Sequence, residues 1–150
     1  MSTSHFSSEG QGTPTAPGRF VDVSAIESVE AIPGLEFRPV IGQNTMTNFV
    51  SFPPNTRAPM HSHEEEQIAI VLDGEFEFQI DDEVRTMRAG DVAVIPPWVP
   101  HGAWTNDSSC YEVDVFNPPR GTLIEHALSQ VGIPVAASGA ASTTDDTPSA

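Results

Sequence analysis

Turn-forming residues recur at short intervals through the middle of the chain and leave room only for short strands between them. Residues 35–41 and 45–52 are strand-like, and Gly42-Gln43-Asn44 separates them. Residues 75–80 alternate polar and apolar side chains, as a strand with one buried face does. Closely spaced strands with Gly, Pro and Asp turns are typical of an all-β sandwich or barrel. The sequence therefore predicts an all-β fold.

Two more turn signals and one helical pattern complete the expected arrangement. Asp73-Gly74 ends the apolar run 68–72 and is a strong hairpin signal. Ala89-Gly90 predicts a further turn before the buried strand 92–95. Only residues 123–130 have a helical pattern, so we expect a single short helix near the end of the fold.

The composition changes at both ends of the chain, which has 150 residues and fits one domain. Residues 1–19 are small and polar, and residues 136–150 are rich in Ala, Ser, Thr and Asp. Both stretches lack the large apolar side chains that a core needs, so we expect disordered tails around a folded unit at 20–135. The N-terminus has no basic stretch followed by an apolar one, so a cytoplasmic location is expected.

The charge of the chain argues against two classes of partner. The formal net charge is −15, which repels phosphate backbones and anionic lipids, so nucleic acid and membrane partners are disfavoured. All six basic residues are arginines, which a codon-biased genome or a salt-adapted host would both explain. Cys110 is the only cysteine and excludes an intrachain disulfide; we expect a small buried side chain there.

The segment from Met60 to Gln67 contains candidate metal ligands. His61 and His63 are two residues apart, so in an extended chain both imidazoles point to the same side. Gln67 follows after a turn, and its amide oxygen is a neutral donor for a third position. His101 is the candidate fourth ligand, because it follows the proline-stiffened turn 96–100 that would fix it before a metal binds.

Such a ligand set predicts one divalent metal ion with a strong Lewis-acid character, since three imidazoles and an amide leave the metal its full charge. Imidazole and oxygen ligands suit manganese, iron, nickel, cobalt or zinc. A one-residue shift of the turn would let Glu66 replace Gln67, so this alternative stays open. Glu64 and Glu65 are interpreted as a solvated acidic turn, and His5 and His126 are placed outside the site.

These motifs resemble those of the cupin superfamily. The first motif is matched by His61-Ser62-His63, Gln67 at the usual glutamate position, and Gly74; the second is matched by Gly90, Pro96 and His101. The resemblance covers roughly residues 45–118 and implies a jelly roll, or double-stranded β-helix barrel, with the metal inside. It also implies a homodimer formed through N-terminal strands, in agreement with the apolar stretch 20–26. Trp98 departs from the pattern, because a glycine is frequent at its position.

A closer resemblance points to the small cupins that open 4,5-unsaturated uronate sugars in pectin and alginate breakdown. It is carried by residues 67–68, 71–78 and 114–120. By this resemblance, Asp114, Phe116 and Arg120 line the substrate pocket. The scaffold is also similar to cupin hydroxynitrile lyases, small cupin oxygenases and cupin polyketide cyclases.

The residues themselves suggest further roles in the pocket. Glu112, Asp114 and Phe116 share one strand face, so Asp114 could act as a general acid or base beside the metal, or form a structural hydrogen bond with Arg88 or Arg120. Arg120 could bind a substrate carboxylate or form a surface ion pair. Arg57 is a weaker candidate for the same role as Arg120, and it is considered because it shares strand parity with His61 and His63. Trp98 could form a wall of the pocket, or a core or dimer contact, as could Trp104 and Tyr111.

Three functions follow from this reading. The first is a metal-dependent isomerase or lyase for a small oxygenated, carboxylated substrate, with Asp114 as the proton shuttle. The second is a cupin oxygenase or a polyketide or natural-product tailoring enzyme that uses the same metal site. The third is a cupin that binds a metabolite without catalysis.

Overall fold

The computed structural model describes residues 3–6, 10 and 12–131, and most of these form β-strands. The expected C-terminal tail at 136–150 lies outside the described residues, as do 1–2, 7–9 and 11 of the expected N-terminal tail. The strands are β1 Val29–Ile32, β2 Leu35–Ile41, β3 Met46–Phe52, β4 Arg57–His61, β5 Glu66–Ile80, β6 Glu83–Arg88, β7 Val92–Ile95, β8 His101–Trp104 and β9 Cys110–Asn117. The helical elements are η1 Thr3–Phe6, η2 Val23–Ala25, η3 Gly121–Leu123 and α1 Ile124–Gln130.

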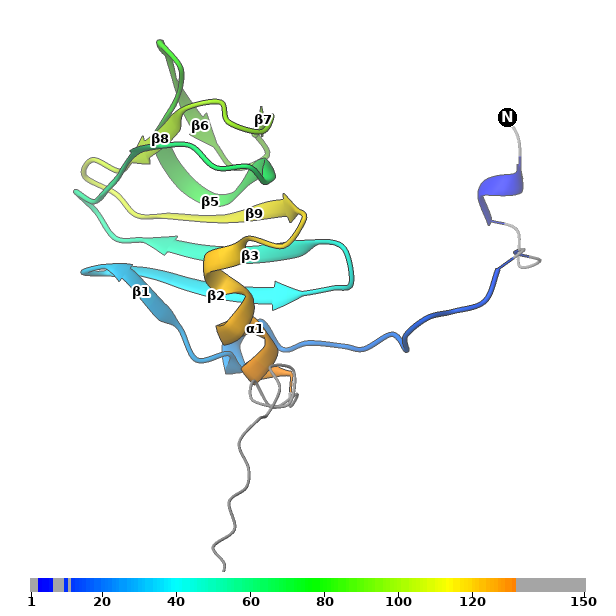
Figure 1. The fold of residues 1–150 in the computed structure, drawn as a ribbon. Helices are drawn as coiled ribbons and strands as arrows, with labels where there is room; N and C mark the ends of the chain where they lie inside the picture. The colour runs from blue at the N-terminus through cyan, green and yellow to red at the C-terminus, as the bar shows by residue number, and fades with distance from the viewer. Residues whose placement is uncertain (1–2, 7–9, 11, 132–150) are drawn as a thin grey trace, which may run out of the picture.

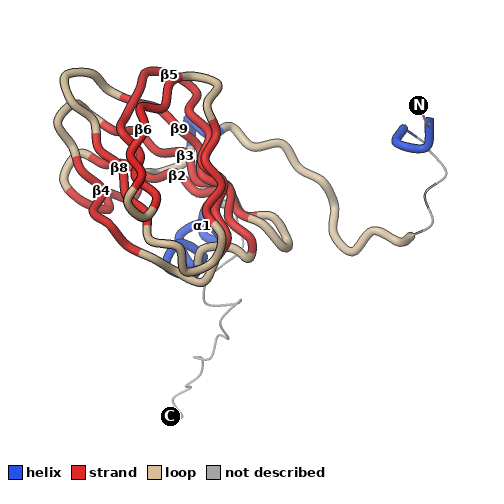
Figure 2. The backbone as a smooth tube through the Cα atoms, turned by 90° about the horizontal axis from the view of Figure 1, so that it is seen from above, coloured by secondary structure: helices blue, strands red, loops and turns tan. Residues whose placement is uncertain are grey.

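The strands curl into a half-barrel that encloses an inner face (Figures 1 and 2). Their order is β1-β2-β3-β9-β5-β8-β4, and β6 and β7 also pair with β5. All strand pairs are antiparallel. The all-β prediction is therefore confirmed, and the curl gives the sheet one concave face on which side chains converge.

Strand β5 runs through the position where the sequence predicts a hairpin, so the prediction at Asp73-Gly74 is wrong. The first part of β5 pairs with β7 and β9, and its second part pairs with β6 and β8. Gly74 has φ of +78°, and a Cβ there would clash with the backbone carbonyl oxygen of Ser109. The glycine therefore lets the strand bend tightly against β9 and pass from one group of partners to the other.

The inner face is apolar along most of its length. Alternate residues of β3, β5 and β9 are buried there, and the rings of Phe52 and Phe76 meet edge to face at 5.4 Å. Cys110 is 2% exposed at the start of β9, as expected, and burial raises the pKa of its thiol to about 12. The buried polar residues of this face belong to the site described below.

The chain after β9 covers one end of the half-barrel. Helix α1 follows the 3₁₀ turn η3 and packs on β2, which confirms the helix expected at 123–130. Leu123 and Ala127 form a small apolar cluster with Met46 and Phe116. Because Arg120 immediately precedes this packed segment, its backbone is held beside the end of β9. Among the described residues, no helix is long and apolar enough to cross a membrane.

Substituting Gly74 by Ala should destabilise the protein more than the same change at Gly90. Both glycines have positive φ, but a Cβ at Gly90 meets nothing within 4 Å. Gly90→Ala should cost about 1–2 kcal/mol of backbone strain. Gly74→Ala adds a clash with a backbone oxygen and should cost at least about 3 kcal/mol in total. Urea unfolding of both variants measures the difference, and equal losses would contradict the tight bend.

Candidate metal centre

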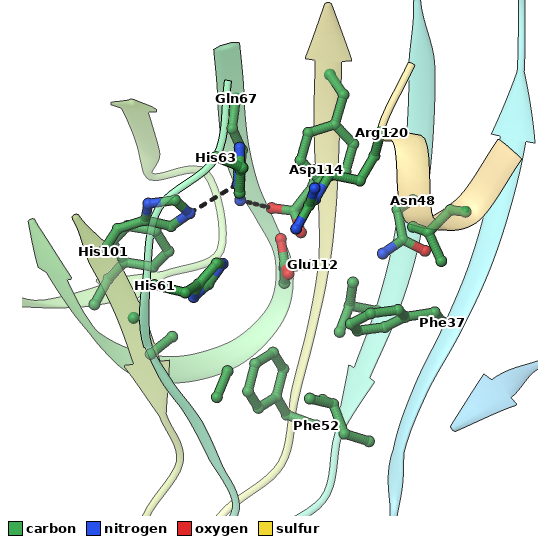
Figure 3. Close-up of a pocket in the computed structure, with 18 of the residues that line it drawn as sticks. Phe37, Asn48, Phe52, His61, His63, Gln67, His101, Glu112, Asp114 and Arg120 are labelled. Atoms are coloured by element: carbon green, nitrogen blue, oxygen red, sulfur yellow. Dashed lines mark hydrogen bonds between the residues drawn. The ribbon is translucent and has the colours of Figure 1, made fainter. Parts of the chain in front are cut away.

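Three histidines from two segments of the chain meet at one end of the inner face (Figure 3). His61 ends β4, His101 begins β8, and these two residues pair across the strands. His63 lies in the turn between β4 and β5. The ring centroids are 4.3 Å apart for His61 and His101, and 5.0 Å apart for His63 and His101. One ring nitrogen from each histidine lies within 4.8 Å of the others, so the three could hold a metal ion.

Each of these imidazoles is oriented by a backbone carbonyl two residues away. The Nδ1 distances are 2.8 Å from His61 to Pro59 O, 3.0 Å from His63 to Glu65 O, and 2.9 Å from His101 to Val99 O. Because a carbonyl oxygen only accepts, each Nδ1 carries the proton and donates it. The Nε2 atom of each neutral ring then has a free lone pair, which is the form that binds a metal.

Gln67 adds an oxygen to this group. Its Oε1 lies 3.1 Å from His63 Nε2 and 3.0 Å from His101 Nε2, and its Nε2 donates to Asp114 Oδ1 at 2.7 Å. Burial lowers the pKa of His101 to about 4 and also lowers the pKa of His63, so neither ring carries a second proton near neutral pH. The atoms that face one another are therefore all acceptors. A divalent cation is the group that fits them.

The alternative ligand Glu66 lies on the other side of β5. Its side chain is exposed, whereas Gln67 is 5% exposed and points inward. The two remaining histidines lie elsewhere: His126 is in α1, where its Nε2 contacts the Glu27 carbonyl at 2.6 Å, and His5 is in η1. The structure thus brings together His61, His63, His101 and Gln67. It places Glu66, His5 and His126 outside this group.

Glu65 is buried, contrary to the expectation of a solvated turn. It is 5% exposed and accepts hydrogen bonds from Arg120 Nη1 at 3.1 Å and from the Gly121 amide at 3.2 Å. Burial alone would raise the pKa of Glu65, but the Gly121 hydrogen bond and the Arg120 charge outweigh it, and the pKa lies below its usual value. Glu65 therefore fixes Arg120 at the site. Nothing in the run of three glutamates distinguished it, because the turn that buries it is formed by tertiary contacts.

A cavity of about 130 Å³ extends from the metal centre into the half-barrel. Asp114, Phe116 and Arg120 line it, as the resemblance implied. The polar lining residues are Asn48, His61, His63, Gln67, His101, Glu112, Asp114, Arg120 and Thr122. The large apolar lining residues are Leu35, Phe37, Val50, Phe52, Phe76, Phe78, Phe116 and Leu123. The cavity thus has a polar part beside the histidines and an apolar part deeper in the fold.

Two buried carboxyl groups stand side by side in the polar part. Glu112 and Asp114 are alternate residues of β9 and are 3% and 8% exposed. Burial raises the pKa of Asp114 to about 6. Burial and the neighbouring Asp114 raise the pKa of Glu112 well above its usual range. Arg88 is not their partner, since it is exposed and pairs with Glu75 at 3.5 Å.

Arg57 does not line the cavity, although it was expected to share the histidine side of the strand. The register of β4 against β8 shifts between Ala58 and His61, so strand parity does not carry from residue 57 to residue 61. Ala58 and His61 both face the cavity, while the Arg57 guanidinium lies 4.3 Å from the centre of the Trp104 ring. Arg57 therefore makes a cation–π contact with Trp104 and is corrected to a position outside the site.

Trp98 is likewise not among the cavity-lining residues, and its side chain is 64% exposed. Its backbone explains the departure from the motif: φ is +67°, a conformation that favours glycine. The Trp98 amide donates to the His63 carbonyl at 2.8 Å. This residue therefore supports the turn that presents His63, and the predicted contact of its ring with substrate lacks support in the geometry. Tyr111 also lies outside the cavity and stacks on Phe49 at 6.3 Å.

Comparisons with known proteins agree with this geometry. The cupin domain family matches residues 48–116. H2HPP isomerase of Bacillus subtilis is 46% identical over 52 residues, which are 34% of this chain and only 22% of the relative. The structure of KdgF from Halomonas sp. superposes with a TM-score of 0.67 and 28% identity, covering 71% of this chain and 99% of that chain. The structure of a RmlC-like cupin from Shewanella frigidimarina superposes with a TM-score of 0.66 and 25% identity, covering 71% of this chain and 96% of that chain.

Divalent metal should stabilise the protein through these histidines. A ligand that binds only the folded state adds about 2.7 kcal/mol at one hundred times its dissociation constant. We expect metal-stripped protein to gain stability with Mn²⁺, Ni²⁺, Co²⁺ or Zn²⁺ in thermal unfolding, and His61→Ala and His101→Ala to lose most of that gain. His126→Ala removes a histidine outside the site and should keep it. A full gain in both site variants would contradict the assignment.

Proposed function

We propose that this chain, whose residues 48–116 match the cupin domain family, is a metal-dependent enzyme of the isomerase or lyase type. Its substrate class is a small oxygenated, carboxylated molecule such as a 4,5-unsaturated uronate. The observation that carries the proposal is the cluster of acceptor atoms from His61, His63, His101 and Gln67, with Asp114 attached to it by a 2.7 Å hydrogen bond from Gln67. The name of the B. subtilis relative and the resemblance over residues 114–120 support the reaction type and the substrate.

In this proposal, His61, His63, His101 and Gln67 hold one divalent ion of manganese, iron, nickel, cobalt or zinc. Once bound, the ion supplies Lewis-acid polarisation of a carbonyl or hydroxyl oxygen. Asp114 removes a proton from one substrate atom and returns it to another, so an isomerisation leaves the enzyme unchanged. The Gln67 amide fixes the Asp114 carboxyl on the wall of the cavity, which gives the proton carrier a defined position.

Arg120 and Phe116 position the substrate. Glu65 occupies one end of the Arg120 guanidinium, and the remaining N–H groups of this five-donor side chain are available to a substrate carboxylate. The Phe116 ring lies 5.8 Å from the His63 ring and forms an apolar wall beside the ligands. Together they would orient the carboxylate end of the substrate near the proton carrier.

The apolar part of the cavity favours a second candidate. Six large apolar side chains lie deeper than the histidines, namely Leu35, Phe37, Val50, Phe52, Phe76 and Phe78. They would suit the ring system of a polyketide or another natural product, so a tailoring enzyme or oxygenase on the same metal site is the alternative. Oxygen consumption with candidate substrates separates an oxygenase from an isomerase, and binding without turnover would indicate a metabolite-binding cupin.

We further propose a homodimer that uses the apolar segment 20–26. Phe20 is fully exposed and Val21 is 39% exposed in the single chain, so association would remove apolar surface from water. Light scattering should give twice the chain mass of 16.1 kDa, and Phe20→Ser should shift the mass toward the monomer. Phe6→Ser changes an exposed phenylalanine outside the segment and should have no effect. A monomeric wild type would contradict the proposal.

Asp114→Asn should abolish most turnover while the metal stays bound. Loss of a general acid or base typically costs about 10²–10⁴-fold in rate. The measurement is the disappearance of a 4,5-unsaturated uronate, followed by the absorbance of its double bond, together with metal content. Asp82→Asn changes an exposed turn carboxylate and serves as the control. Full turnover by Asp114→Asn would remove the proton-shuttle role, and full turnover by metal-free protein would refute the metal-dependent mechanism.

A further inference from the structure

Two buried polar atoms in the cavity wall accept no hydrogen bond from an N–H or hydroxyl group of the described residues. They are Oδ1 of Asn48 and Oε2 of Glu112. The Glu112 carboxyl can share a proton with Asp114 in a hydrogen bond between the two side chains, whereas the Asn48 oxygen has no such neighbour. The two residues are 1% and 3% exposed, and both line the cavity. Leaving such atoms unpaired costs free energy, so a native structure that retains two of them in one cavity calls for an explanation.

The two side chains lie on adjacent strands, beside the metal centre but not in it. In the β3–β9 pair, Asn48 is opposite Asp114 and Val50 is opposite Glu112, so Asn48 and Glu112 are diagonal neighbours on the inner face. On the other side of β9 lies β5, which carries Gln67, the residue that donates to Asp114. Asn48 therefore lies across Asp114 from the histidines (Figure 3).

The positions that continue this face beyond the two side chains are apolar. Val50 and Phe52 continue the inner face of β3 as apolar residues, and Val71 and Phe76 do the same on β5. An apolar side chain of similar size at position 48 or 112 would continue this apolar lining without an unpaired atom. The polar groups therefore suit a ligand better than they suit the folded core.

The chemistry of the two groups selects the ligand. A carboxylate would be repelled by Glu112 and Asp114, whereas a hydroxyl both donates and accepts a hydrogen bond. A hydroxyl therefore pairs with the Asn48 amide in either orientation and with the Glu112 carboxyl in either protonation state. We propose that Asn48 and Glu112 form a hydroxyl-binding subsite, and that the substrate carries a hydroxyl on the part that reaches past Asp114. This inference rests on the proposed function and specifies its substrate class.

Binding of two matched acids tests the subsite without turnover. D-Galacturonate and tetrahydropyran-2-carboxylate share a ring and a carboxylate, but only the first has hydroxyls. With zinc-loaded full-length protein, NMR titration should show tighter binding of D-galacturonate. Asn48→Leu and Glu112→Leu should each reduce this preference by about tenfold, while their affinity for the hydroxyl-free acid stays near the wild-type value. Asn44→Leu in an exposed turn should change neither affinity.

Stability provides a second, independent measurement. Since Asn48→Leu replaces an unpaired buried polar group by an apolar one of similar size, this variant should unfold at a higher midpoint than wild type in the absence of ligand. Glu112→Leu also removes the hydrogen bond to Asp114, so the stability test uses Asn48→Leu. A side chain with a structural role would give the opposite sign. Zinc content should equal that of wild type, because neither residue is in the metal centre.

The outcomes separate this inference from the proposed function. Protein that prefers D-galacturonate through Asn48 and Glu112 but does not convert an unsaturated uronate would refute the proposed function and retain the subsite. Equal wild-type affinity for the two acids, or no binding of either, would overturn the subsite, because the two atoms would then hold only solvent. A lower unfolding midpoint of Asn48→Leu would also overturn it.

Discussion

The pairing of β5 on both of its edges is the constraint on which the site depends. Between β7 and β9 its first part has a fixed register, which places Gln67 beside Phe116 and Ala69 beside Asp114. This register turns Gln67 inward and Glu66 outward, and it brings the Gln67 amide to the Asp114 carboxyl. A shift by one residue would exchange these two side chains, because successive residues of a strand face opposite sides. The ligand set is therefore a consequence of strand pairing.

The sequence was informative where short-range rules decide the structure. Strand parity correctly placed Glu112, Asp114 and Phe116 on one face, and turn residues marked the ends of β6 and β7. His61 and His101 come together because they pair across β4 and β8, and His63 follows in the turn after β4. In these places the local preference and the tertiary structure agree, so a reading of the residues alone recovers the all-β fold and the side chains that meet.

The remaining features depend on contacts between distant segments. The Gly74 conformation allows either a hairpin or a bend, and the pairing of β5 with β9 selects the bend. The register shift in β4 arises from its pairing with β8 and moves Arg57 out of the site. Glu65 is buried because Arg120, more than fifty residues later, donates to it. No pattern in a single segment carries this information, since each partner is supplied by another part of the chain.

The amide at position 67 fits the charge of the cavity better than the carboxylate that is commoner at this motif position. Asp114 and Glu112 already place two carboxyl groups in the same buried wall, and the repulsion between them contributes to the raised pKa of Glu112. Gln67 donates to Asp114 and still directs an oxygen toward His63 and His101. A carboxylate there would face Asp114 without a proton to donate, so a third acid would have to be neutralised. The amide thus joins the candidate metal centre to Asp114 through a hydrogen bond, and the chain retains a buried acid beside its histidines without adding another.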